Sequence, residues 1–201
     1  MGSSMSTFRE RQRQQREAEI LAAAYALMTE HGYDGMTMDE VAQQVGIAKV
    51  TLYQHFASKE ALAAGIAVDQ MRHVEDELQP FYDSDGPALD RLRAVLRHSL
   101  EQQAPKWVAN LPPNARFVAQ HPAFQALYAT RAAQWERLVE QAKREGSLDS
   151  GVATAVLVRM MQQLFAPGYE DLVRSGRVAP EDVVHTLLTI VLRGVRADGS
   201  P

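Results

Sequence analysis

Apolar residues recur at intervals of three and four positions along nearly the whole chain, a spacing that predicts amphipathic helices. No stretch alternates apolar and polar residues over the length of a strand, and β-branched residues are scattered. The protein is therefore expected to be all-α. The pattern predicts helices over about residues 9–31, 37–46, 49–56, 58–79, 87–103, 122–145, 151–165 and 180–195. Pro80 and Gly146 are expected to lie just beyond the ends of two of them.

Capping signals define the second of these helices most clearly. Thr37 and Glu40 have the spacing of a capping box, and Met36 with Val41 has that of the hydrophobic staple that accompanies it. Gly46 is the residue type that tolerates the left-handed conformation at a helix end. A short helix between Thr37 and Gly46 is therefore expected.

The two short helices joined by a turn at residues 46–48 are typical of a helix-turn-helix, whose second helix enters the major groove of DNA. Five apolar residues can pack against the first helix to make a three-helix head: Val41, Val45, Ile47, Leu52 and Phe56. The side chains left facing outward are Lys49, Val50 and Gln54, with Thr51, Tyr53 and His55 at the edges.

These outward side chains suit a DNA groove. Gln can read adenine, Lys can read guanine, and Val can contact a thymine methyl group. Thr, Tyr and His can donate hydrogen bonds to phosphate oxygens, which position a helix without reading sequence. A helix-turn-helix used only for packing is the alternative interpretation.

The formal net charge of −4 argues weakly against nucleic-acid binding, but the distribution of charge matters more than the total. Residues 1–16 carry four Arg and one Glu, and residues 41–58 carry Lys49 and no acidic residue. The chain has no Cys, which excludes disulfides and thiolate metal sites, and its six His are dispersed, so neither a metal nor a cofactor is expected. Without a run of 18 apolar residues or a secretory signal, a cytoplasmic protein with no membrane partner is expected.

The stretch from Arg16 to Ile66 resembles the DNA-binding head of the TetR family of bacterial regulators. The resemblance covers about a quarter of the chain and rests on the cap, the turn and the motifs TLYQHF (51–56) and SKEAL (58–62), all in register. It implies a repressor that binds a palindromic operator as a homodimer, and a larger C-terminal helical domain that dimerises and binds a small-molecule inducer. We therefore expect a DNA-binding domain over residues 8–66 and a ligand-binding and dimerisation domain over residues 67–196.

The resemblance also implies roles for individual residues. Lys49, Val50 and Gln54 occupy base-reading positions. The positions that contact phosphates are Thr37, Thr51, Tyr53, His55 and Lys59. Arg9, Arg11 and Arg13 lie in a variable arm that can reach the adjacent backbone or minor groove. Two positions depart from the family's pattern: Ala48 stands where Ser is usual, and Val50 where Gly is commoner.

The last two predicted helices are apolar around more than one face, whereas a surface helix has one apolar stripe. Each helix then needs two partners. The resemblance implies that one partner is the core of the C-terminal domain and that the other is the same pair of helices in a second subunit. Leu188 and Val191 are then expected at the contact between the two subunits. A buried hairpin in a monomer is the alternative.

The long helix over residues 122–145 places Arg131 in the middle of an apolar face, where an unpaired charge is costly. Arg131 can bind an anionic group of a ligand, pair with a carboxylate or extend to solvent. The residues that can line an apolar ligand pocket are Trp107, Phe117, Phe124, Tyr128, Arg131, Trp135, Met160 and Phe165. Aromatic residues at helical spacing are equally typical of a plain core.

The function indicated by the sequence is a ligand-released repressor that binds double-stranded operator DNA as a homodimer. A ligand-independent or architectural DNA-binding protein is the alternative. An enzyme is not indicated, because the sequence has no G-x-S-x-G elbow, no phosphate-cradling Gly loop and no H-E-x-x-H.

Overall fold

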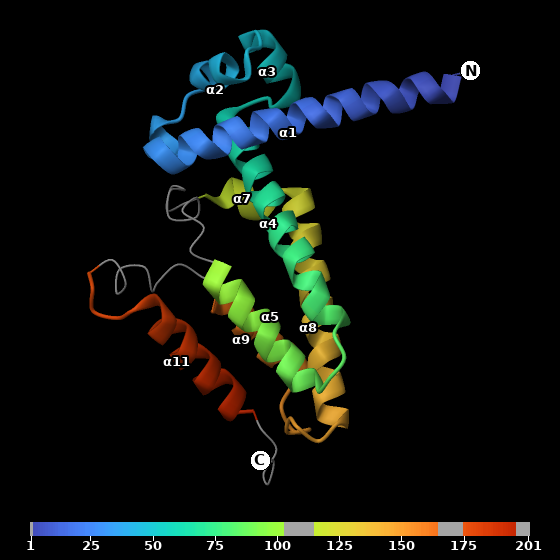
Figure 1. Ribbon diagram of the computed structural model, residues 1–201, viewed down its shortest axis with the longest axis vertical. Coiled ribbons are helices and arrows are strands. Elements are labelled where there is room, and N and C mark those ends of the chain that lie inside the picture. Colours follow the sequence, from blue (N-terminus) through green and yellow to red (C-terminus); the bar gives the residue numbers. More distant parts are fainter. Residues whose placement is uncertain (1, 103–114, 165–174, 196–201) are drawn as a thin grey trace. The chain divides into compact units, whose positions relative to one another are not determined.

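The computed structural model describes residues 2–102, 115–164 and 175–195, and the chain in these ranges is helical and contains no β-strand (Figure 1). The expected all-α fold class is confirmed. The helices are α1 (Gly2–Gly35), α2 (Met38–Val45), α3 (Lys49–His55), α4 (Lys59–Asp83), α5 (Ala88–Gln102), α7 (Arg116–Gln120), α8 (Pro122–Arg144), α9 (Thr154–Gln163) and α11 (Pro180–Arg193). None of these described helices combines the length and the apolar composition that crossing a lipid bilayer requires.

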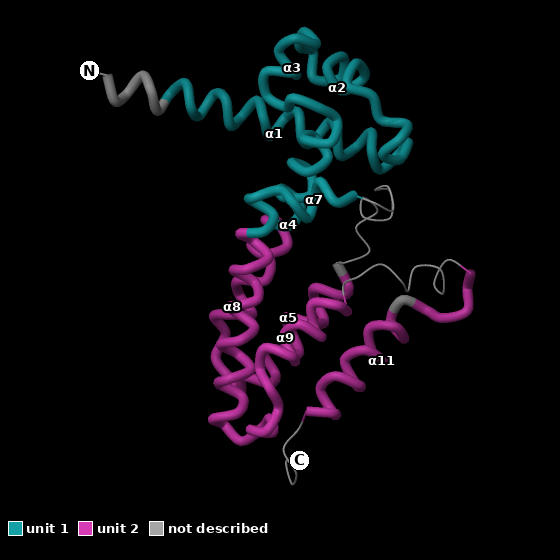
Figure 2. The backbone as a smooth tube through the Cα atoms, turned by 180° about the vertical axis from the view of Figure 1, so that it is seen from behind, with its two compact units in different colours: residues 1–71, 106–125 teal, residues 72–105, 126–201 magenta. Residues whose placement is uncertain are grey.

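The chain packs into two compact units (Figure 2). Unit 1 comprises residues 1–71 and 106–125, and unit 2 comprises residues 72–105 and 126–201. This division differs from the expected boundary between residues 66 and 67. Unit 1 continues further along α4, and it also includes α7, because Val118 is buried in the same apolar cluster as α1 and α2. Residues 106–125 lie far along the chain from the rest of unit 1, so local periodicity does not predict that they pack with it.

The core of unit 1 confirms the predicted three-helix head. The apolar face of α1 contributes Ile20, Ala24 and Met28, all fully buried, and α3 contributes Leu52. Val41 of α2 is also fully buried in this cluster. Val45, Ile47 and Phe56 are partly buried against it, as predicted.

Three helix boundaries differ from the prediction. α1 begins at Gly2 rather than near residue 9, although it breaks at Gly32 as predicted, where φ is 73°. α4 does not end before Pro80 but continues to Asp83. Because Leu78 and Tyr82 on either side of the proline are buried in the unit 2 core, we attribute the continuation to packing that outweighs the lost hydrogen bond. α9 begins at Thr154 rather than Gly151.

The core of unit 2 is formed by one face of each of its helices. Leu92 and Leu96 of α5, Trp135 of α8 and Met161 of α9 are fully buried, and Val191 of α11 joins them. Helices α5 and α11 pack side by side (Figure 1). Unit 2 is thus a helical body with its own apolar core.

Candidate functional site

The start of α2 and the turn between α2 and α3 are both fixed by local structure. The predicted capping box is present: the Glu40 N–H donates to Oγ1 of Thr37 (3.2 Å), and the Thr37 N–H donates to Oε2 of Glu40 (3.1 Å). The Thr37 hydroxyl also donates to this carboxylate (2.7 Å), and these bonds hold the pKa of Glu40 below its usual range. Gly46 adopts the left-handed conformation with φ 72° and ψ 35°, which turns the chain toward α3.

Helix α3 presents a face of exposed side chains. Val50 is 70% exposed and Tyr53 is 43% exposed, and Gln54 is also exposed, whereas Leu52 between them is fully buried. This face combines an apolar side chain with hydrogen-bonding side chains, which is the chemistry that reads base edges and phosphates in a DNA groove. Thr51 lies half-buried at the edge of the same helix, as predicted.

Lys49 begins α3 and forms an ion pair with Asp39 of α2, with Nζ 2.7 Å from Oδ1. The hydrogen bond to Asp39 raises the pKa of Lys49, so its positive charge is retained. Both side chains are more than half exposed, and an exposed ion pair contributes little to stability. Lys49 can therefore exchange this carboxylate for a base or phosphate at small cost.

His55 does not face outward as expected. Its side chain is only 14% exposed, and Nδ1 lies 3.2 Å from Oε1 of Glu17 on α1. Glu17 also accepts from Nε of Arg13 at 2.9 Å. Partial burial raises the pKa of Glu17, but the bonds from Arg13 and His55 outweigh it and hold the pKa below its usual range. His55 thus ties the end of α3 to α1.

Lys59 and the arginines of α1 also belong to unit 1. Nζ of Lys59 donates to the Asp34 carbonyl oxygen at 3.1 Å and lies 4.5 Å from the centre of the Tyr33 ring. Arg9 and Arg11 are exposed on α1, as the variable arm requires. Asp39, Glu17 and Tyr33 were not predictable as site residues from the sequence, because the partner of each lies on another helix.

The residues predicted to line a ligand pocket are distributed over both units. Trp107 and Phe165 lie outside the described residues. Phe117 and Phe124 are half-buried in unit 1, where the Phe117 ring stacks on Tyr33 with centroids 5.8 Å apart. The remaining four belong to unit 2, and Met160 among them is 43% exposed rather than turned inward.

In unit 2 the buried Arg131 pairs with the carboxylate of Glu75. Of the three possibilities for Arg131, pairing with a carboxylate is the one present, so its charge is already compensated. Trp135 is fully buried and its Nε1–H donates to the Tyr82 hydroxyl at 3.0 Å. Burial raises the pKa of Tyr82, which keeps this hydroxyl neutral. Tyr128 is half-buried on the same helix.

Helices α9 and α11 have the second apolar face that the sequence predicted. Val156 and Ile190 are 68% and 66% exposed. Leu188 and Val191, expected at a subunit contact, are instead 5% and 3% exposed within the protomer's own core. Both faces are apolar in sequence, and periodicity does not tell which one turns inward. We call Val156, Met160 and Ile190 the exposed apolar face.

Comparison with known proteins agrees with this architecture. Residues 20–66 match the family model "Bacterial regulatory proteins, tetR family". The chain is similar to the HTH-type transcriptional repressor KstR2 of Mycobacterium tuberculosis, with 24% identity over 92% of this chain and 94% of that protein. Its fold is similar to that of the transcriptional regulator FadR from Bacillus subtilis in complex with stearoyl-CoA (TM-score 0.71, 14% identity, 89% of this chain and 99% of that one). It is also similar to that of AibR in complex with isovaleryl coenzyme A and operator DNA (TM-score 0.64, 24% identity, 87% and 97%).

The match to the family model covers the helix-turn-helix, and the similarity to KstR2 extends over nearly the whole chain. These relatives are transcriptional regulators rather than enzymes. Together with the exposed face of α3, the family match over residues 20–66 and the similarity to KstR2 indicate a DNA-binding transcriptional regulator with a helix-turn-helix of the TetR type.

Proposed function

We propose that the protein is a repressor that binds a palindromic double-stranded operator as a homodimer and is released by a small-molecule ligand. The observation that carries this proposal is the exposed face of α3, where Val50, Tyr53 and Gln54 project from a helix held by a buried leucine and a capped turn. Such a helix has the size and the chemistry that the major groove admits.

Within this proposal, Lys49, Val50 and Gln54 read base edges and the surrounding residues contact phosphates. The phosphate contacts are Thr37, Thr51, Tyr53 and Lys59. His55 is proposed to act differently from the expectation: its link to Glu17 sets the orientation of α3 rather than contacting DNA. Phosphate contacts position a helix, and base contacts specify the sequence.

A homodimer follows from the length of α3 and from the exposed apolar face. One helix of seven residues reads too few bases for a specific site, whereas a two-fold pair reads two half-sites about 34–36 Å apart. Isolated apolar side chains on a surface are common, but here Val156, Met160 and Ile190 lie on two helices that pack into one core. We propose that α9 and α11 of two subunits meet through this face.

For the ligand, we propose an acyl thioester of coenzyme A. Two structural neighbours support this class, since one is described with stearoyl-CoA and the other with isovaleryl coenzyme A. The half-buried Tyr128 of unit 2 is a candidate for contact with an acyl chain.

The test is to select operator sequences from random DNA with the full chain and then to measure binding by fluorescence anisotropy. We expect a palindromic sequence to be enriched, and stearoyl-CoA or isovaleryl-CoA, but not free coenzyme A, to release it. Gln54→Ala should lose the selected preference, while Gln44→Ala, an equally exposed glutamine on α2, should keep it. Enrichment without release by either thioester would favour a ligand-independent regulator, and no enrichment would contradict the proposal.

A further inference from the structure

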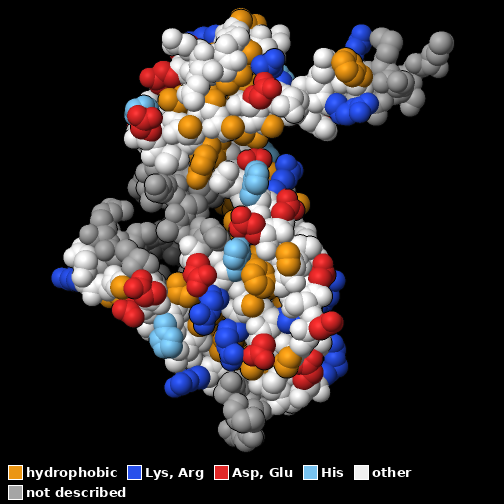
Figure 3. Space-filling view, viewed as in Figure 1, with side chains coloured by type: hydrophobic (Ala, Val, Ile, Leu, Met, Phe, Trp, Pro, Cys, Tyr) orange, Lys and Arg blue, Asp and Glu red, His pale blue; other side chains and the backbone are white. Residues whose placement is uncertain are grey.

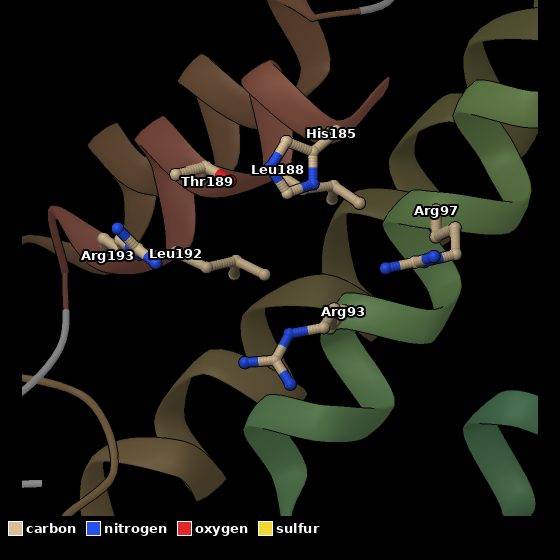
Figure 4. Close-up of a pocket in the computed structure, with 7 residues that line it drawn as sticks. All are labelled: Arg93, Arg97, His185, Leu188, Thr189, Leu192 and Arg193. Atoms are coloured by element: carbon tan, nitrogen blue, oxygen red, sulfur yellow. The ribbon is translucent and has the colours of Figure 1, made fainter. Parts of the chain in front are cut away.

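Unit 2 contains a pocket between α5 and α11 that is lined by three arginines together with apolar and neutral polar side chains and has a volume of about 240 Å³. The guanidinium groups of Arg93 and Arg97 extend from α5 toward α11, and Arg193 lies across from them on α11 (Figure 4). Leu188 and Leu192 supply the apolar part of the wall. No carboxylate is among the described residues that line this pocket.

The positive charge of this pocket is mostly uncompensated. Arg93 pairs with Asp90 at 2.8 Å, but that carboxylate is 60% exposed. Arg97 and Arg193 are exposed, and neither forms an ion pair with any residue in the described ranges. Figure 3 shows basic side chains on the face that carries α5 and α11, with acidic side chains also present there. Like charges held close together repel, so an anion bound between them would relieve this repulsion.

We propose that this pocket binds the phosphate or diphosphate group of a small molecule. The guanidinium fork matches the geometry of phosphate oxygens, and charge-assisted hydrogen bonds of this kind are the strong ones. Two arginines that have no ion-pair partner among the described residues, beside a third that is only partly neutralised, suit a group with two or more negative charges better than a single carboxylate. Thr189 and His185 add two further donors from α11.

The size of the pocket indicates that it holds the anionic end of a ligand. Pockets that enclose a whole drug-sized ligand occupy roughly 300–1,000 Å³, which is more than is present here. The two leucines then contact whatever carbon atoms lie next to the phosphate. A free inorganic anion has the same charged group, so the test has to separate these two sources.

The pocket residues of α11 are spread around the helix relative to Ile190. At about 100° per residue, His185 and Leu192 lie about 140° and 160° from Ile190, whereas Arg193 lies about 60° from it. A dimer formed through Ile190 would therefore leave the side of the pocket at His185 and Leu192 accessible and bring Arg193 closer to the partner subunit. The phosphate site depends neither on operator binding nor on the thioester proposed above.

Inorganic pyrophosphate is the first probe, titrated into the full chain by isothermal titration calorimetry with ionic strength held constant by chloride. We expect saturable binding and a rise in melting temperature, with no such effect from acetate, which carries one charge. Arg97→Gln and Arg193→Gln should each weaken binding about tenfold, the effect of removing one hydrogen bond to a charged group. Arg93→Gln should weaken it less, because Asp90 already holds part of that charge. A second titration with adenosine diphosphate separates the sources: tighter binding than pyrophosphate assigns the site to an organic phosphate, and equal binding to a free anion.

Arg137→Gln is the matched control, since Arg137 is an exposed arginine of α8 that does not line the pocket. These substitutions replace surface side chains, so the fold should be retained. The proposal is overturned if pyrophosphate does not saturate, if the Arg97→Gln/Arg193→Gln double variant binds it as the parent does, or if Arg137→Gln weakens binding equally. Loss of the dimer in the double variant, without pyrophosphate binding by the parent, would assign these arginines to a subunit contact instead.

Discussion

Gln54 and Tyr53 are neighbours on α3, and we predict that they make different kinds of contact with DNA. Gln54→Ala should relax the preference at one base-pair position and cost roughly 1–3 kcal/mol there. Tyr53→Phe should weaken all sequences about equally, because a phosphate contact carries no sequence information. Competition between the selected operator and single-base variants measures both effects. If Tyr53→Phe changed which base wins at a position, the two roles would be reversed.

Glu17 should make the stability of unit 1 sensitive to acid. Its pKa in the folded protein lies below the ordinary value of 4.5, so its contribution is fully present above that value and is lost as the pH falls through the lowered pKa. Glu17→Gln should therefore lower the free energy of unfolding at neutral pH, and the difference from the parent should shrink below about pH 4. Denaturant unfolding at several pH values measures this. Glu136→Gln, at an exposed position of α8, should show no such trend.

Hydrogen-bonded residues that are close in sequence were predictable from the sequence, and hydrogen-bonded residues that are far apart were not. Thr37 and Glu40 are three residues apart, and the spacing alone identified their reciprocal hydrogen bonds. The carboxylates that pair with His55 and Arg131 lie 38 and 56 residues away in the sequence. The helical pattern around each residue therefore could not identify its partner. The outward orientation expected for His55 was wrong for this reason.

Helix α3 begins without a side-chain cap, and Ala48→Ser should supply one. Ala48 has the extended conformation of an N-cap residue (φ −67°, ψ 145°) but no side-chain oxygen to accept from the first-turn N–H groups. A serine there should stabilise the helix by about 0.5–2 kcal/mol, and its hydroxyl can also donate to a phosphate. We expect added hydrogen-exchange protection at Val50 and Thr51 and tighter operator binding with unchanged sequence preference. No change in either would mean that the turn satisfies these amides by another route.

The existence of every described helix except α7 was predictable from the sequence, and the helix ends were less so. Apolar spacing located the helices, and Gly32 and Gly46 marked two of the breaks correctly. Pro80 was expected to end α4 because proline removes one hydrogen bond and crowds the preceding turn. The packing of Leu78 and Tyr82 into the unit 2 core is not encoded in local sequence, and it carries the helix past the proline.

For the whole molecule, operator binding should fall steeply with salt despite the net charge of −4. Each phosphate neutralised contributes about −0.9 to the slope of log K against log salt. Engagement of Lys49, Lys59 and part of the arginine arm in both subunits gives a slope of roughly −4 to −8. Lys49→Gln should make the slope shallower by about 2 in a dimer. An affinity insensitive to salt would contradict contact between α3 and the DNA backbone.

The organisation into units was only partly predictable. A helical head and a helical body follow from the motif and from the apolar pattern. The inclusion of residues 106–125 in unit 1 depends on contacts across about a hundred positions. The sequence also showed that α9 and α11 have two apolar faces, but only the packing of the protomer shows that Ile190, and not Leu188, faces solvent.

This distinction gives a direct test of the dimer. Ile190 is 66% exposed, so Ile190→Glu buries no charge within the protomer and should leave its fold intact. In a dimer formed through the exposed apolar face, the same charge would be buried against the partner, and dissociation should follow. Light scattering should then report a monomer with a normal circular dichroism spectrum and weak operator binding.

Leu188→Glu should behave differently, because Leu188 is buried in the core of unit 2 and a charge there destabilises the protomer itself. Its expected result is a large fall in melting temperature rather than a folded monomer. Ala133→Glu, at an exposed position of α8, controls for the added charge and should remain dimeric. If Ile190→Glu and Val156→Glu both stayed dimeric with full operator affinity, the two subunits would have to meet through another surface. If Leu188→Glu instead gave a stable monomer, Leu188 would belong to the subunit contact after all.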